Sequence, residues 1–194
     1  MPPPAHPPIV RVDEARDLAR DLLRQLPERW QHSAGVAHRA EELACTIGDD
    51  NPALLVCAAW LHDIGYSPEI ADTGFHPLDG ARYLRRRCWP SRLCALIAHH
   101  SGAVYVAAAQ GLSLPLADFP REQTPLSDAL TYADQTVGPN GRPMSVAERS
   151  ADMLARRGGD SPNAKVHHLR GPYLLAVANR VRAKLHAPVL QSIG

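Results

Sequence analysis

Residues 52–63 constrain the fold most, because their sequence PALLVCAAWLHD is apolar on nearly every side of the helix that it predicts. Asn51 is a favourable N-cap for this helix, and Pro52 suits its first turn. A helix that is apolar all round is buried, so we expect this one at the centre of a hydrophobic core. It ends in His62 and Asp63, two ionisable groups that need partners when they are buried.

The remainder of the chain also predicts helices, and no segment alternates apolar and polar residues as a half-buried strand would. Apolar residues recur at helical spacing over residues 13–26, 30–47, 76–87, 91–100, 103–110, 125–137, 145–157 and 172–185. Loops are expected over residues 66–75 and 111–125. The sequence therefore predicts a compact, all-α, multi-helix domain over residues 11–190, preceded by a disordered, Pro-rich N-terminus over residues 1–10.

Charge and composition narrow the class of protein. The 21 basic residues nearly balance the 20 acidic ones and give a net charge of +1, which disfavours binding to nucleic acid or anionic lipid through bulk charge. We find no apolar run long enough for a membrane span and no secretory signal. Four cysteines without a CxxC pair indicate reduced thiols in a cytoplasmic protein, and the predominance of Arg over Lys suggests a bacterial genome with high GC content.

Histidine and aspartate residues near helix ends or in apolar helices are the candidate chemical groups. Besides His62 and Asp63 they are His32, His76, His99, His100 and Asp134. Imidazole and carboxylate ligands together suit Fe, Mn, Ni, Co or Zn, and they do not choose among these divalent ions. The seven groups exceed the needs of one tetrahedral ion but suffice for two ions that share a bridging carboxylate. Asp63 is the natural bridge, because it adjoins another ligand and offers two oxygens.

The order of these residues resembles that of a known family. The motifs HS, HD followed by IG, HP, HH and AD, found between Trp30 and Gln135, resemble those of the HD superfamily of metal-dependent phosphohydrolases. The chain is most similar to the branch with additional histidines for a two-metal centre, as in the HD-GYP phosphodiesterases. The resemblance implies that one ion is held by His32, His62, Asp63 and Asp134. It implies that the other is held by Asp63 with His76, His99 and His100, and it leaves open whether one of the two adjacent histidines only lines the site.

The same resemblance implies a catalytic role for His62 and Asp63, which would act through metal-activated water on a nucleotide or another small phosphate ester. Two departures from the family pattern concern the substrate. Tyr66 stands where the phosphodiesterases usually have Lys, and the GYP segment after the paired histidines is absent. The sequence therefore predicts neither cyclic-dinucleotide hydrolysis nor the identity of the substrate-binding residues.

Two alternative functions stay open at this point. The HD superfamily also includes mixed-valent di-iron oxygenases, whose His and Asp ligands come in the same order. Other HD domains are non-catalytic metal-binding modules in signalling. We expect a hydrolase that uses one or two divalent transition-metal ions and a small-molecule phosphate ester, with no role for a membrane or nucleic acid. The oligomeric state is left open.

Overall fold

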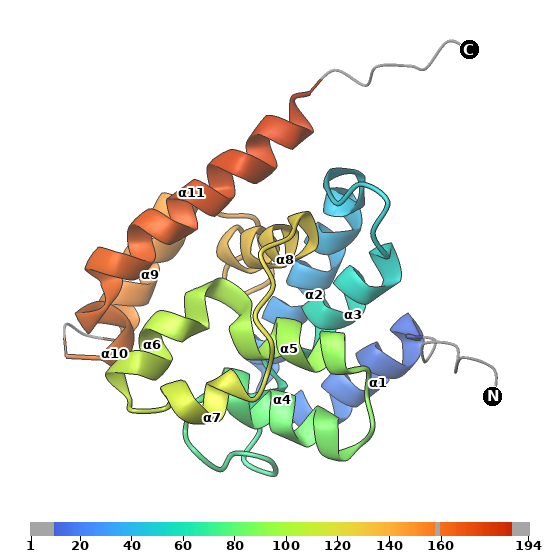
Figure 1. The fold of residues 1–194 in the computed structure, drawn as a ribbon, viewed down its shortest axis with the longest axis vertical. Coiled ribbons are helices and arrows are strands. Elements are labelled where there is room, and N and C mark those ends of the chain that lie inside the picture. The colour runs from blue at the N-terminus through green and yellow to red at the C-terminus, as the bar shows by residue number, and fades with distance from the viewer. Residues whose placement is uncertain (1–9, 158–159, 188–194) are drawn as a thin grey trace.

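The computed structural model describes residues 10–157 and 160–187, which form helices joined by loops and turns (Figure 1). Within these residues, the only β-type pairing is an isolated bridge between Val137 and Pro143. The predicted all-α class is therefore confirmed. Residues 1–9 of the predicted disordered N-terminus lie outside the described residues, as do residues 158–159 and 188–190 of the predicted domain. No helix in the described part of the chain combines the length and apolar character needed to cross a membrane.

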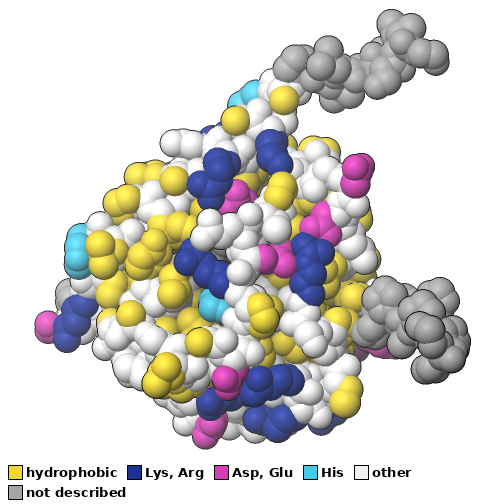
Figure 2. Space-filling view, viewed as in Figure 1, with side chains coloured by type: hydrophobic (Ala, Val, Ile, Leu, Met, Phe, Trp, Pro, Cys, Tyr) yellow, Lys and Arg dark blue, Asp and Glu magenta, His cyan; other side chains and the backbone are white. Residues whose placement is uncertain are grey.

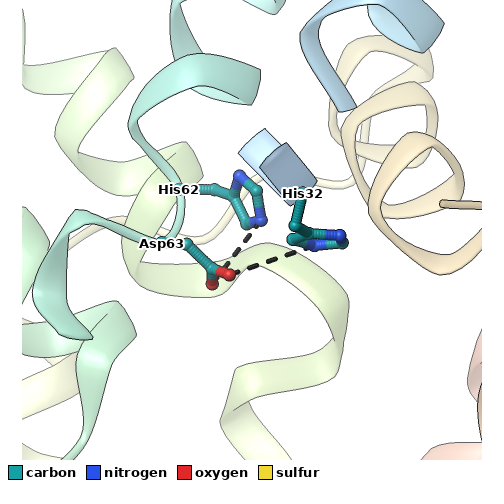
Figure 3. A group of neighbouring side chains, drawn as sticks. All are labelled: His32, His62 and Asp63. Carbon is teal, nitrogen blue, oxygen red and sulfur yellow. Dashed lines mark ion pairs between the residues drawn. The ribbon is translucent and has the colours of Figure 1, made fainter. Parts of the chain in front are cut away.

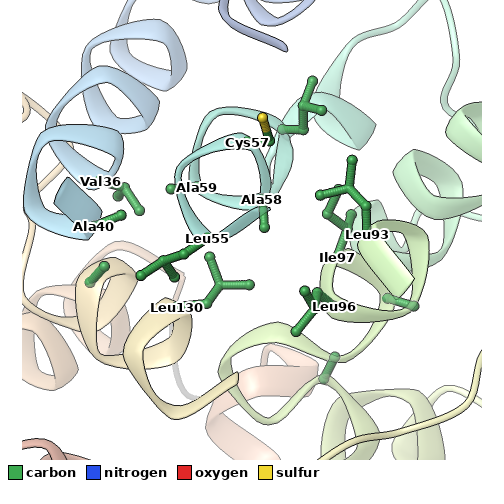
Figure 4. Packing of buried hydrophobic residues seen from close by; sticks show 14 of the residues in the cluster. Val36, Ala40, Leu55, Cys57, Ala58, Ala59, Leu93, Leu96, Ile97 and Leu130 are labelled. Carbon is green, nitrogen blue, oxygen red and sulfur yellow. The ribbon is translucent and has the colours of Figure 1, made fainter. Parts of the chain in front are cut away.

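The central helix is α3 (Pro52–Leu61), which contacts α1 (Val12–Leu23), α2 (Pro27–Glu42), α5 (Ser91–His99) and α8 (Pro125–Gln135). Asn51 caps it as predicted, because its side chain accepts hydrogen bonds from the backbone N–H groups of Ala53 and Leu54. Residues 54–59 are all buried, and Figure 4 shows apolar side chains of the neighbouring helices packed around them. The predicted central position of this helix is confirmed, and its C-terminal end lies inside the protein.

The remaining elements surround this core. Between α2 and α5 the chain forms the 3₁₀ turns η1 (Leu43–Thr46) and η2 (Ile64–Tyr66) and the helix α4 (His76–Arg86). It continues through η3 (His100–Gly102), α6 (Ala103–Ala109) and α7 (Ser113–Ala117) to α8. The C-terminal part contains α9 (Val146–Arg157), α10 (Pro162–Lys165) and α11 (His167–Leu185). Because α4 contacts both η2 and α5, and η3 contacts α8, the motif-bearing segments meet around the C-terminal end of α3.

Several helix boundaries differ from the prediction. Pro27 is the first residue of α2, three residues before the predicted start of that helix, since a proline without an N–H group is tolerated at the first helical position. The predicted loop 111–125 contains the short helix α7. The last helix begins at His167, five residues before its predicted start, and it continues through Pro172. Burial of its apolar face, including Leu174 and Val177, keeps this helix continuous despite the backbone hydrogen bond that proline removes.

Candidate metal centre

His32, His62, Asp63 and Asp134 meet at the C-terminal end of α3, and Figure 3 shows the first three converging from α2 and α3. His32, His62 and Asp63 each present one ligand atom within 4.8 Å of the others. Asp134, on α8, lies next to them, with its Oδ1 2.9 Å from His32 Nε2 and 3.8 Å from His62 Nε2. All four side chains are buried. The structure thus brings together the four residues that the resemblance assigns to one ion.

Asp63 also belongs to a second group, with His76 and His100. The Nε2 atom of His76 lies 3.3 Å from Asp63 Oδ1 and 3.3 Å from His100 Nε2. The ring of Tyr66 stacks on the ring of His76, with 4.0 Å between their centres, and so fixes its plane. The two groups share Asp63, and this arrangement is the one that a carboxylate bridging two ions requires.

Backbone carbonyls at helix ends set the tautomers of His62 and His100. The Nδ1 atom of His62 lies 2.7 Å from the carbonyl oxygen of Ala59, and that of His100 lies 2.7 Å from the carbonyl oxygen of Ile97. A carbonyl only accepts hydrogen bonds, so each Nδ1 carries the proton and each Nε2 presents a lone pair to the cluster. In both cases the carbonyl belongs to the last turn of a helix, three residues before the histidine, where it has no partner within the helix.

The Nδ1 atom of His32 also contacts a backbone carbonyl, but this carbonyl comes from a distant part of the chain. Its Nδ1 lies 3.1 Å from the carbonyl oxygen of Gly138, just after α8, so its Nε2 points at Asp134 as a lone pair. Two electron pairs at 2.9 Å repel each other unless a proton or a metal cation lies between them. His62 Nε2 is buried and has no hydrogen-bond partner within the described residues. The Nε2 atoms of His32 and His62, together with two carboxylates, form a donor set that fits divalent transition-metal ions.

The electrostatics of the site prepare its side chains for ligation. Burial lowers the pKa of His62 and of His100, and it lowers the pKa of His76 to about 4, so these imidazoles are neutral near pH 7. Burial by itself would raise the pKa of Asp63, but the cationic form of His62 and the Arg29 guanidinium hold it well below its usual range. Metal ligands must be neutral imidazoles and ionised carboxylates, and these shifts provide both.

A strained turn holds Asp134 in place. Ser101 has a left-handed conformation, with a φ of 52°, although it has a side chain, and Gly102 follows with a φ of 70°. This turn lets the Ser101 hydroxyl donate a hydrogen bond to Asp134 Oδ2, and the Gln135 side-chain amide donates to the same oxygen at 2.8 Å. Arg170 secures the turn from α11, because its Nε donates to the Ser101 carbonyl oxygen at 2.7 Å. Strain of this kind is commonly retained where it positions a functional group.

Close backbone packing fixes His76 relative to Asp63. A Cβ atom added to Gly65 would lie only 2.0 Å from the carbonyl oxygen of His76, so η2 and the start of α4 approach more closely than any other residue type allows. Asp79 orders the loop before α4, since its carboxylate accepts hydrogen bonds from the backbone N–H groups of Asp72 and Thr73 at 3.0–3.1 Å. These contacts explain why a glycine follows the HD pair so closely.

His99 is the one predicted ligand that the structure places outside the cluster. Its Nε2 donates a hydrogen bond to the carbonyl oxygen of Phe119 at 2.7 Å, and it belongs to neither metal-binding group. Helix α5 ends at His99, and His100 already has an extended backbone with a φ of −58° and a ψ of 151°, so the two adjacent side chains point in different directions. The predicted ligand set is corrected accordingly: His100 joins the cluster and His99 does not.

Comparison with protein families agrees with this geometry. The model of the HD domain matches residues 29–138, which are more than half of the chain and include all six clustered residues. The chain belongs to the HD domain family. HD domains bind divalent metals and are typically metal-dependent hydrolases. Comparison with curated proteins and with solved structures gave no match.

Sequence reasoning missed two arginines beside the metal centre of this HD domain. Arg29 donates from Nη1 to Asp63 Oδ2 at 3.0 Å, and its guanidinium lies 4.0 Å above the centre of the Tyr66 ring. Its position three residues before His32, on the same face of α2, is a signal that could have identified it. Arg149, on α9, lies 3.8 Å from Asp134 through Nη2 and Oδ1. No local pattern connects Arg149 to the motifs, because the tertiary fold alone brings α9 to the site.

The metal centre of the HD domain opens into a cavity of about 560 Å³. Besides the clustered side chains, the cavity is lined by four arginines, namely Arg29, Arg149, Arg156 and Arg170. A volume of this size suits a small molecule. Carboxylates also line the cavity, including Glu28 and Asp152. On the face shown in Figure 2, basic and acidic side chains are likewise interspersed.

Proposed function

We propose that this HD domain is a metal-dependent phosphohydrolase that acts on a small phosphate ester, such as a nucleotide. One observation carries the proposal: two ligand groups share Asp63 in a small-molecule cavity that arginine side chains line. Carboxylate and imidazole ligands fit divalent transition metals, and guanidinium groups pair with phosphoryl oxygens through parallel N–H donors. The combination suits a phosphate ester better than an uncharged substrate.

Each residue of the cluster has a defined part in this proposal. His32, His62, Asp63 and Asp134 would hold one ion, and Asp63, His76 and His100 would hold the other. Divalent ions held there would supply Lewis-acid polarisation of the phosphoryl group and would increase the acidity of a water molecule at neutral pH. A direct role for His62 in proton transfer is not needed, because its Nδ1 proton is already donated to Ala59 and its Nε2 faces the ligand cluster.

The side chains around the ions would orient the ester. Arg29 is fixed on one side by its hydrogen bond to Asp63 and on another by the Tyr66 ring, so its remaining N–H donors have a defined direction. A guanidinium held in this way can bind a phosphoryl oxygen without first losing conformational freedom. Ser101 and Gln135 keep the Asp134 carboxylate in place during the reaction.

The test begins with the metal content of protein purified with and without oxygen, measured by elemental analysis. The protein is then reconstituted with Mn²⁺, Co²⁺, Ni²⁺ or Zn²⁺, and phosphate release is followed for nucleoside monophosphates and p-nitrophenyl phosphate. We expect up to two ions per chain and metal-dependent phosphate release. A matched pair of variants on α2 controls for folding: His32→Gln removes a buried ligand, whereas His38→Gln changes a side chain that is 76% exposed.

Three outcomes would reject the hydrolase. Two irons per chain with oxygen consumption and no phosphate release would favour the oxygenase chemistry of the superfamily. Stoichiometric metal with neither activity would favour a metal-binding signalling module. Wild-type metal content in the His32→Gln protein would show that the cluster is structural and would remove the basis of the proposal.

A further inference from the structure

The wall of the cavity continues beyond the segment that matches the HD family. The match ends at residue 138, but α9 and α10 line the cavity with further side chains. From this wall Arg149 reaches the metal ligands, with its Nη2 3.8 Å from Asp134 Oδ1. Its side chain is only 16% exposed, so its charge lies largely inside the cavity wall.

The hydrogen-bonding capacity of Arg149 is largely unused. Its Nε is buried and has no hydrogen-bond partner within the described residues. Its ion pairs with Asp134 and Asp152, at 3.8 and 3.6 Å, are longer than hydrogen bonds. The Nη1 and Nη2 groups therefore keep N–H donors that these ion pairs do not use, and a ligand that supplies acceptor oxygens to them would be stabilised there.

Ion pairs on α9, and between α9 and α2, support this position of Arg149. Asp152, one turn further along α9, accepts a hydrogen bond from Arg156 Nε at 2.8 Å. Arg156 also lies 3.7 Å from Glu28 at the start of α2, so α9 is tied to α2. Two guanidinium groups thus share the Asp152 carboxylate, and this network holds Arg149 beside Asp134.

We propose that Arg149 binds the phosphoryl group of the substrate and is a specificity-determining residue of the site. This inference rests on the proposed function, because the ligand is the phosphate ester of that reaction. The ester would lie between the metal ligands and α9, with Arg149 on the Asp134 side and Arg29 on the Asp63 side. The planar guanidinium presents parallel N–H donors that match two phosphoryl oxygens.

Binding of inorganic phosphate to Mn²⁺-reconstituted protein, measured by isothermal titration calorimetry, tests this role separately from turnover. Arg149→Lys keeps the charge beside Asp134 but lacks the planar fork and Nε, and Arg149→Met removes the charge. We expect phosphate affinity to fall about 10-fold in the lysine variant and up to about 100-fold in the methionine variant, as for hydrogen bonds between charged groups. Metal content should be unchanged in Arg149→Lys, and KM for the ester should rise in parallel.

Arg142→Met is the matched control, because Arg142 lies in the turn before α9 and has an exposed side chain that does not line the cavity. We expect its phosphate affinity to stay within about threefold of wild type, since exposed charges are screened. Wild-type affinity in Arg149→Lys, or equal losses in the Arg149→Met and Arg142→Met variants, would overturn the specific contact. In that case ester hydrolysis by the wild-type protein would leave the proposed function standing. A wild-type protein that neither binds phosphate nor hydrolyses esters would reject both proposals.

Discussion

Replacing Gly65 by alanine tests how closely the metal centre depends on backbone packing. The added Cβ would lie 2.0 Å from the carbonyl oxygen of His76 and 2.8 Å from the backbone nitrogen of Gly80. Both atoms belong to the backbone of α4, so no side-chain rotation can relieve the contact. Real Cβ atoms essentially never approach another heavy atom within 3.0 Å, so η2 and α4 must separate by about 1 Å or more.

The expected cost follows from that displacement. Overpacking a well-packed core destabilises proteins by about 1–3 kcal/mol, and a clash with backbone alone belongs at the upper end, about 3 kcal/mol. Moving the start of α4 would also carry His76 away from Asp63, where the two side chains are now 3.3 Å apart. We therefore expect Gly65→Ala to lose stability and to lose the ion held by His76 and His100, while the ion held by His32 and His62 is retained.

Urea unfolding of the metal-free protein, followed by circular dichroism, measures the stability change without a contribution from metal binding. Elemental analysis of the reconstituted protein measures the number of ions. Gly171→Ala is the control, because the three atoms nearest to its Cβ would all belong to the His167 side chain, the closest at 3.3 Å, and alanine favours a helix. It should stay within about 1 kcal/mol of wild type. If Gly65→Ala were as stable as Gly171→Ala and kept the full metal content, the packing argument would be refuted.

Other predictions concern single residues and the metal. His100→Gln should lose about one ion per chain, whereas His99→Gln should keep wild-type metal content by elemental analysis; equal losses would contradict the assignment of these adjacent histidines. Asn51→Ala should lower the free energy of unfolding by about 1 kcal/mol in urea titrations, because α3 loses its cap, and should leave the ion count unchanged. Chelation should lower the Tm of the wild-type protein in thermal scans but not that of Asp63→Asn, since bound metal stabilises only the folded state that offers both groups.

Local patterns in the sequence predicted much of this fold. The buried α3, its Asn51 cap and the all-α class follow from residue type and helical spacing, which act over a few residues of chain. The sequence also predicted the chemical nature of the site, because the candidate ligands at the motif positions are imidazoles and carboxylates. Boundaries were less predictable: α7 and the early start of α11 depend on packing against other helices.

The choice among the candidate ligands required the three-dimensional arrangement. His99 and His100 are adjacent residues of the same type, but the end of α5 between them directs only His100 toward the cluster. The carbonyls that set the tautomer of each imidazole and the Arg149 guanidinium beside Asp134 come from helix ends and from a helix far along the chain. Such directions are set by contacts between distant segments, whereas sequence periodicity reports only which side of a helix faces the core.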